Sequence, residues 1–138
     1  MNKFFVVDTN TLVSASLIGG TKTATAMDRV IILGKLAFSN GTMDEFVEVL
    51  FRKKFDKYFL NNEEKWSAIQ RISLSAIFFS PTEVITECRD PKDDKFLELT
   101  ISSNASCIIS GDKDLLILNP FRGIPILNAV DFLNNFYK

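Results

Sequence analysis

Aspartate stands at two points where a short apolar run gives way to a polar, helix-forming stretch. Asp8 follows "KFFVV", and Asp112 follows "CIISG" much later in the chain, with Asp114 close behind it. If both runs are parallel strands of one open sheet, the two carboxylates leave it at the same edge and can converge. Taken singly, each aspartate is also a suitable helix cap, because its oxygens can accept from the free N–H groups of a helix start. Both interpretations stay open at this point.

Two further segments carry acids near the start of expected helices, "TMDEFVEVLFRKKF" and "DPKDDKFLELTISS". Such acids also suit the positive end of a helix dipole. Four acid-bearing boundaries brought together would form a cluster of like charge, which is costly unless a cation neutralises it. Oxygen ligands without histidine or cysteine select magnesium or manganese. The pattern therefore predicts a site for Mg²⁺ or Mn²⁺.

The composition narrows the chemistry further. The 138 residues include no histidine, which excludes Ser-His-Asp and Cys-His nucleophile systems and any His-ligated metal. Cys88 and Cys107 lie far apart without a C-x-x-C partner, so neither a zinc site nor a disulfide framework is indicated. The net charge of −1 predicts no strong general attraction to nucleic acid and does not exclude a local one. The start "MNKFFVVDTN" contains an apolar run that Asp8 interrupts, and this run is too short for a signal peptide or a membrane span. We therefore expect a cytoplasmic protein.

The length suits one domain over residues 1–138, in which strands and helices are expected to alternate. Strands are predicted at 3–7, 36–38, near 83–85, at 107–109 and within "IPIL". Helices are predicted at 10–18, from 21 to about 35, at 42–58, from 61 to just before Pro81, at 93–103, from 112, and at the C-terminal end. This order predicts an α/β fold with a mostly parallel sheet and helices on both faces.

Four segments, taken in order and spacing, resemble the PIN domain nucleases, in particular the single-domain subgroup that forms the toxins of toxin-antitoxin pairs. They are "VVDTNTLVSA", "MDEFVEVLFRKKF", "CRDPKDDKFLELTISSNASCIISGDKDLL" and "GIPILNAVDFL", which together span nearly the whole chain. The resemblance implies a three-layer α/β/α sandwich and a ribonuclease activity that depends on Mg²⁺ or Mn²⁺. It also implies an antitoxin protein as partner and frequent homodimers.

The resemblance also assigns roles to residues. The family's four acids fall, in order, on Asp8, Glu45, Asp93 and Asp112, which would hold one or two metal ions. Asn10 and Ser110 match polar positions that would orient the carboxylates or a water molecule; helix capping or a turn explains both equally well. Thr100 stands where alanine is usual and Gly41 where proline or another helix former is common, and neither departure removes an acid.

Helical spacing separates the acids of each cluster. Residues four apart share a face, so Asp44, Glu48 and Arg52 form a polar column, while Glu45 stands above Val49. Asp94, Glu98 and Ser102 form a second polar column, while Asp93 leads into Leu97 and Ile101. We therefore expect Glu45 and Asp93 to face the site, and Glu48 and Asp94 to face solvent.

An RNA substrate needs positive charge near the acids. The candidates are Arg52, Lys53, Lys54, Lys57, Lys92, Lys95 and Lys113. A solvated helix face explains the "RKKFDK" run as well, and its position after Glu45 keeps the RNA interpretation open.

Other functions also fit parts of the pattern. Aspartyl-phosphate phosphatases need a second aspartate two residues after the first, where this chain has Asn10. Receiver-type signalling domains need an acidic pair early in the chain, which "MNKFF" lacks. A domain that binds RNA or a partner without cutting remains an alternative. Cleavage of single-stranded RNA with manganese, compared with the same mixture plus chelator, separates it from a nuclease.

Overall fold

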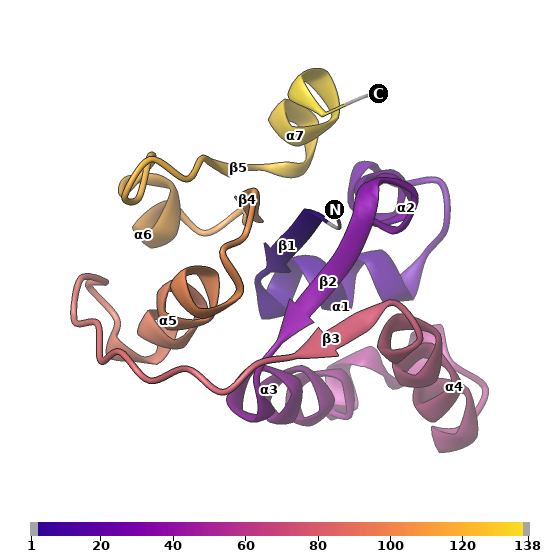
Figure 1. Ribbon diagram of the computed structural model, residues 1–138. Coiled ribbons are helices and arrows are strands. Elements are labelled where there is room, and N and C mark those ends of the chain that lie inside the picture. The colour runs from indigo at the N-terminus through magenta and orange to yellow at the C-terminus, as the bar shows by residue number, and fades with distance from the viewer. Residues whose placement is uncertain (1–2, 137–138) are drawn as a thin grey trace.

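A five-stranded, all-parallel sheet forms the centre of the molecule, as seen in a computed structural model that describes residues 3–136 (Figure 1). The strands lie in the order β3-β2-β1-β4-β5. Their bounds are Lys3–Val7 for β1, Gly34–Phe38 for β2, Ala76–Phe78 for β3, Cys107–Ile109 for β4 and Ile126–Leu127 for β5. Phe5 of β1 is paired with Leu36 on one side and Cys107 on the other. The central strands are apolar on both sides because helices cover both faces of the sheet.

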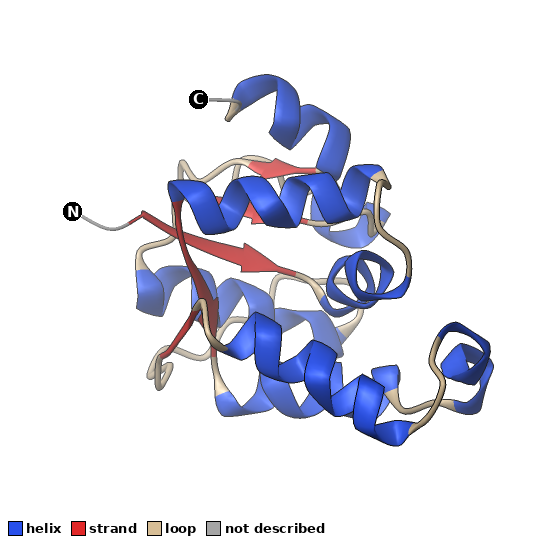
Figure 2. Cartoon of the chain, turned by 90° about the vertical axis from the view of Figure 1, so that its right-hand side faces the viewer, coloured by secondary structure: helices blue, strands red, loops and turns tan. Residues whose placement is uncertain are grey.

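Two hydrophobic cores lie on opposite faces of the sheet, which gives three layers (Figure 2). One core takes buried residues from α1 (Thr9–Leu17), α2 (Lys22–Leu33), α3 (Asn40–Leu50), α4 (Asn62–Ser73) and α7 (Ala129–Asn135). The other takes them from α5 (Asp94–Ser103) and α6 (Lys113–Leu116). Successive strand residues alternate between the cores, Phe5 with the first and Val6 with the second. The predicted α/β architecture is confirmed.

The helix predicted at 42–58 is shorter than expected. The α-helix α3 ends at Leu50, and a 3-10 helix, η1, follows at Lys53–Tyr58. A contact with the next helix holds the segment after the break, because Nζ of the buried Lys65 on α4 lies 2.7 Å from Oδ1 of Asp56. The same ammonium lies over the rings of Phe51 and Phe59. The segment therefore folds back onto α4 rather than continuing the helix.

The third strand lies elsewhere than predicted. Helix α4 ends at Ser73 rather than just before Pro81, and β3 occupies Ala76–Phe78 within the stretch assigned to that helix. Pairing with β2 decides this outcome, and Phe78 stacks on Phe38 with ring centroids 6.0 Å apart. Residues 83–85 form no strand. Ile85 is buried there, and its N–H donates to Glu98 on α5.

The carboxyl ends of β1, β2 and β4 meet at one edge of the sheet because all the strands run parallel. The chain reverses its direction of winding between β1 and β4, a position where open α/β sheets form ligand-binding crevices. Asp8 follows β1, Ser39 follows β2 and Ser110 follows β4. Within residues 3–136, no helix is both long enough and apolar enough to cross a membrane.

Candidate active site

A cavity of about 280 Å³ opens at this edge of the sheet, and acidic side chains dominate its lining. All four acids singled out from the sequence line it. A fifth acid, Asp90, was not predicted, although it stands in "RDPKDD" just before the proline that opens the 3-10 helix η2 (Pro91–Asp93). The lining residues are Asp8, Thr9, Asn10, Glu45, Val49, Arg52, Asp90, Lys92, Asp93, Phe96 and Asp112.

Asp8 caps a helix and lines the cavity at once, so the two interpretations of this residue are compatible. Its Oδ1 accepts from the backbone N–H of Thr11, 3.0 Å away, which caps α1. Its Oδ2 accepts from the Ser110 hydroxyl, 2.5 Å away. The same hydroxyl oxygen accepts from the N–H of Asp112 at 3.0 Å. Ser110 therefore links the ends of β1 and β4 and positions both aspartates.

Asn10 and Thr9 differ from expectation. Asn10 lines the cavity but is exposed, and its side chain forms no hydrogen bond with another residue in the described part of the chain. Its neighbour Thr9, which the sequence did not single out, donates its hydroxyl to Oε2 of Glu45. Thr9, rather than Asn10, therefore positions a carboxylate of the site, that of Glu45.

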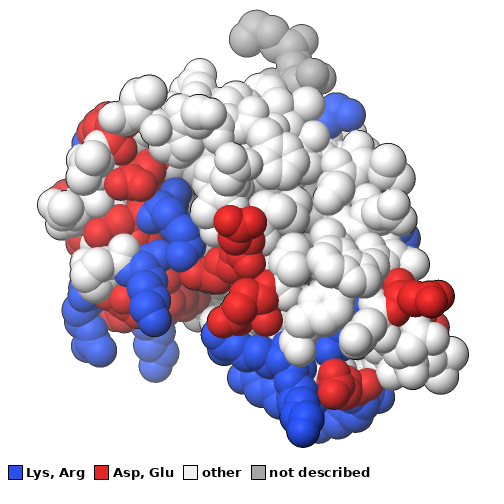
Figure 3. Space-filling view, turned by 90° about the horizontal axis from the view of Figure 1, so that it is seen from below, with Lys and Arg blue, Asp and Glu red and all other residues white. Residues whose placement is uncertain are grey.

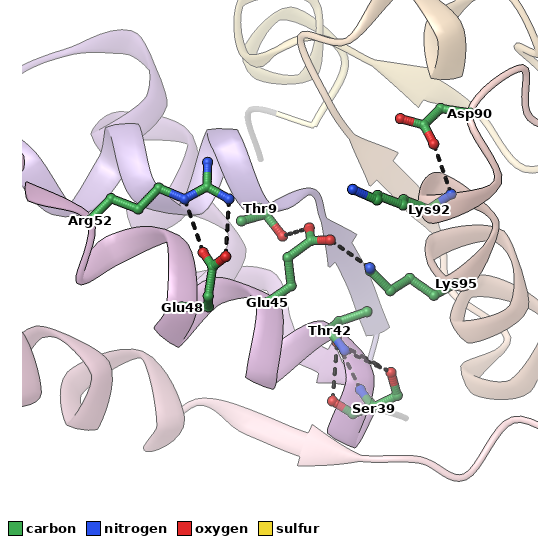
Figure 4. A network of polar contacts seen from close by, with 9 residues as sticks. All are labelled: Thr9, Ser39, Thr42, Glu45, Glu48, Arg52, Asp90, Lys92 and Lys95. Carbon is green, nitrogen blue, oxygen red and sulfur yellow. Dashed lines mark hydrogen bonds and ion pairs between the residues drawn. The ribbon is translucent and has the colours of Figure 1, made fainter. Parts of the chain in front are cut away.

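Glu45 is held from two sides (Figure 4). Thr9 of α1 reaches its Oε2, and Nζ of Lys95 on α5 lies 2.5 Å from its Oε1. The neighbouring acid Glu48 turns away and forms a two-pronged pair with Arg52, at 3.0 and 3.1 Å. The expected difference between Glu45 and Glu48 is therefore present in α3.

Burial, together with neighbouring carboxylates, raises the pKa of two of the acids. Burial is the main cause for Asp8, whose pKa lies above its ordinary value although bonds from Ser110 and Thr11 lower it. For Asp93, burial and then the negative charge of Asp112 raise the pKa to about 6. Both groups carry their charge at a cost at neutral pH, which a bound cation would offset.

The metal-free protein should therefore lose stability as the pH rises through about 6. A carboxyl group whose pKa is higher in the folded state binds its proton more tightly there, so its contribution is present at low pH and disappears above the folded pKa. We expect Asp93→Asn to reduce the difference between the melting temperatures at pH 5.0 and pH 7.5 in chelator, and the exposed Asp44→Asn to leave it unchanged. An equal pH dependence in wild type and Asp93→Asn would contradict this assignment.

The carboxylates that line the cavity are suitable ligands for a hard divalent cation, but their side chains do not surround a position for one ion. Within residues 3–136, no three Asp, Glu, Cys or His side chains lie together closely enough to hold one ion. The carboxylates nonetheless line one cavity, where burial and then neighbouring acids raise the pKa of Asp8 and Asp93. Carboxylate oxygens are the ligands that hard divalent cations prefer, and these side chains line the same cavity.

The expectation for Asp94 is wrong. This side chain is buried, and its Oδ1 accepts from the backbone N–H of Cys88 at 2.8 Å. One turn later, Glu98 accepts from the N–H of Ile85 at 3.0 Å. The segment that precedes η2 therefore covers the polar column of α5, a contact from outside the helix that helical spacing does not reveal.

Asp94→Ala should lower the free energy of unfolding by about 1–3 kcal/mol, because it leaves the N–H of Cys88 without its acceptor. The exposed Ser102→Ala, on the same column, should change it by less than about 0.5 kcal/mol. Urea denaturation in the presence of chelator measures both. Equal stabilities for the two variants would show that Asp94 does not hold this segment.

The two departures from the family pattern are accommodated. The Thr100 hydroxyl is fully buried and donates to the carbonyl of Phe96 at 2.6 Å, so it leaves no unpaired polar group. A Cβ at Gly41 would meet only ordinary contacts at 3.9 Å, which means that glycine is not required there.

The fold and the cavity define an α/β protein with a carboxylate cluster at the carboxyl edge of a parallel sheet. Residues 5–114 match the family model of the PIN domain, and the chain belongs to this family. The crystal structure of PAE2754 from Pyrobaculum aerophilum is similar in fold, with a TM-score of 0.66 and 14% sequence identity. The match covers 99% of this chain and 91% of that one. Among curated proteins, none matches the sequence significantly.

Proposed function

We propose that the protein is a metal-dependent ribonuclease that hydrolyses phosphodiester bonds of single-stranded RNA. The observation that carries this proposal is the meeting of Asp8, Glu45, Asp93 and Asp112 in one cavity of a PIN domain. PIN domains are typically nucleases, and a chain without histidine has to draw its hydrolytic chemistry from carboxylates, lysines or a metal held by oxygen ligands.

The four acids would hold one or two Mg²⁺ or Mn²⁺ ions. Such an ion, when bound, activates a water molecule and neutralises the charge that develops on the phosphodiester. The protein's own contribution is to fix the carboxylates, with Ser110 bound to Asp8 and Thr9 bound to Glu45. Asn10 faces the same cavity and is free to orient the water molecule or the substrate.

Basic side chains around the acids would bind the RNA backbone. Arg52 lines the cavity from the turn between α3 and η1, and Lys92 lines it from η2. Figure 3 shows acidic side chains lying between groups of lysine and arginine. Lys53, Lys54 and Lys57 of η1 continue the positive charge beyond Arg52. Basic side chains on both sides of the acids would bind the RNA phosphates on either side of the bond that is cleaved.

The sequence resemblance to single-domain toxins extends the proposal to the biological setting. In that setting the protein is a cytoplasmic toxin, works as a homodimer and is silenced by a cognate antitoxin protein. The observation that tests this most simply is a small neighbouring reading frame whose product co-purifies with the protein and stops RNA cleavage.

The test of the activity is cleavage of a labelled single-stranded RNA by the purified protein. We expect cleavage with Mn²⁺ and none when excess chelator is present. RNA binding without cleavage under both conditions would instead indicate a non-catalytic RNA-binding domain. Hydrolysis of a phosphate monoester, with RNA left intact, would indicate a phosphatase-like enzyme.

Manganese should also raise the melting temperature of the wild-type protein. A ligand that binds only the folded state stabilises it by about 2.7 kcal/mol when its concentration is a hundred times the dissociation constant. Ca²⁺ is the comparison ion, and we expect it to stabilise the protein without supporting cleavage. A melting temperature that stays constant from micromolar to millimolar Mn²⁺ would count against the metal site.

A further inference from the structure

Lys95 pairs with one of the candidate metal ligands. Its Nζ lies 2.5 Å from Oε1 of Glu45, and both side chains are only 27% exposed. Lys95 belongs to the first turn of α5 and Glu45 to α3, so the pair joins two elements across the site (Figure 4). The lysine stem passes the first turn of α3, where its Cδ lies 3.9 Å from the position of a Cβ on Gly41.

This pair leaves Glu45 with both oxygens engaged. Oε2 accepts from Thr9 and Oε1 faces the ammonium of Lys95. A divalent ion on the same carboxylate would lie close to that ammonium, and two cations at such a distance repel each other strongly in a partly desolvated site. Because both oxygens of Glu45 are already bonded, it is consistent that no three acids among residues 3–136 are grouped around a position for one ion.

We propose that Lys95 is the resident counter-ion of the metal-free site, and that a divalent metal has to displace it from Glu45. This inference rests on the proposed function, because it takes Glu45 to be a metal ligand. Lys95 neutralises part of the acidic cluster while no metal is bound, and it lowers the affinity for metal by the free energy of the pair. Metal binding releases the ammonium beside the cavity.

The test is a calorimetric titration with Mn²⁺ at pH 7.5, without RNA. We expect Lys95→Met to bind Mn²⁺ about fivefold more tightly than wild type, the gain set by an ion pair between partly exposed groups. Lys95→Arg, which retains the charge, should stay near wild type. Lys113→Met is the matched control, because Lys113 is exposed beside Asp112 and has no recorded ion pair in the described part of the chain; its affinity should change by less than about twofold.

The same substitution in a Glu45→Gln background separates direct competition from a general change of charge. There Lys95→Met should give no gain, because the carboxylate that both cations share is gone. The melting temperature in chelator should be lower for Lys95→Met than for wild type, and its rise with Mn²⁺ larger.

Three results would overturn the inference. Weaker Mn²⁺ binding by Lys95→Met would show that Lys95 positions Glu45 for the metal. Equal binding by wild type and Lys95→Met would remove the competition but leave the nuclease proposal intact. No Mn²⁺ binding by any folded variant would remove the metal site and the proposed function together.

Discussion

Asp8→Asn should reduce Mn²⁺-dependent RNA cleavage to below about 1% of the wild-type rate while the protein stays folded. Asp8 lies at the centre of the site, where Ser110 ties it to the start of α6 and its pKa is raised by burial. Asparagine keeps an oxygen that can cap α1 through Thr11, and the Ser110 hydroxyl can accept from the new amide. The variant therefore loses the charge but few of the contacts.

The stability of Asp8→Asn in chelator makes the prediction specific. Because folding raises the pKa of Asp8, its charged form is disfavoured at neutral pH, and the variant should match wild type or gain about 1 kcal/mol. Initial cleavage rates and urea denaturation measure the two effects. Unfolding of the variant would show that Asp8 acts mainly as a helix cap, and full activity would remove it from the metal site.

Glu45→Gln and Asp93→Asn should each lower the cleavage rate at saturating Mn²⁺ by at least about a hundredfold. Both side chains line the cavity, and the negative charge of Glu45 is felt by Asp93. The control is Glu48→Gln. Glu48 is an exposed acid that pairs with Arg52, and it does not line the cavity. It should cost less than about tenfold. A larger loss in Glu48→Gln than in Glu45→Gln would reverse the assignment within α3.

The sequence was sufficient to predict where the acids would meet. Asp8 and Asp112 each follow a strand of continuous apolar residues, and parallel strands bring such boundaries to one edge of the sheet. Glu45 was separable from Glu48 because the local period of a helix decides which side chain faces a neighbour. These features depend on contacts within one element or on the pattern of alternating elements.

The features that were missed depend on contacts between different elements of the fold. Strand β3 formed at Ala76–Phe78 because β2 was available to pair with it, although the same residues continue the apolar period of a helix. Asp94 is buried because the segment around Cys88 crosses α5. Thr9 and Lys95 contact Glu45 from two other helices. Local sequence patterns do not predict such contacts between helices.

The proposed metal site consists of the carboxylates at the ends of β1 and β4 together with Glu45 and Asp93. Anomalous diffraction from crystals soaked in Mn²⁺ tests it most directly. We expect a strong peak inside this cavity, within about 2.1 to 2.3 Å of carboxylate oxygens from Asp8 and at least two of the other three acids. Absence of a peak there at millimolar Mn²⁺, or a peak only at other residues, would contradict it.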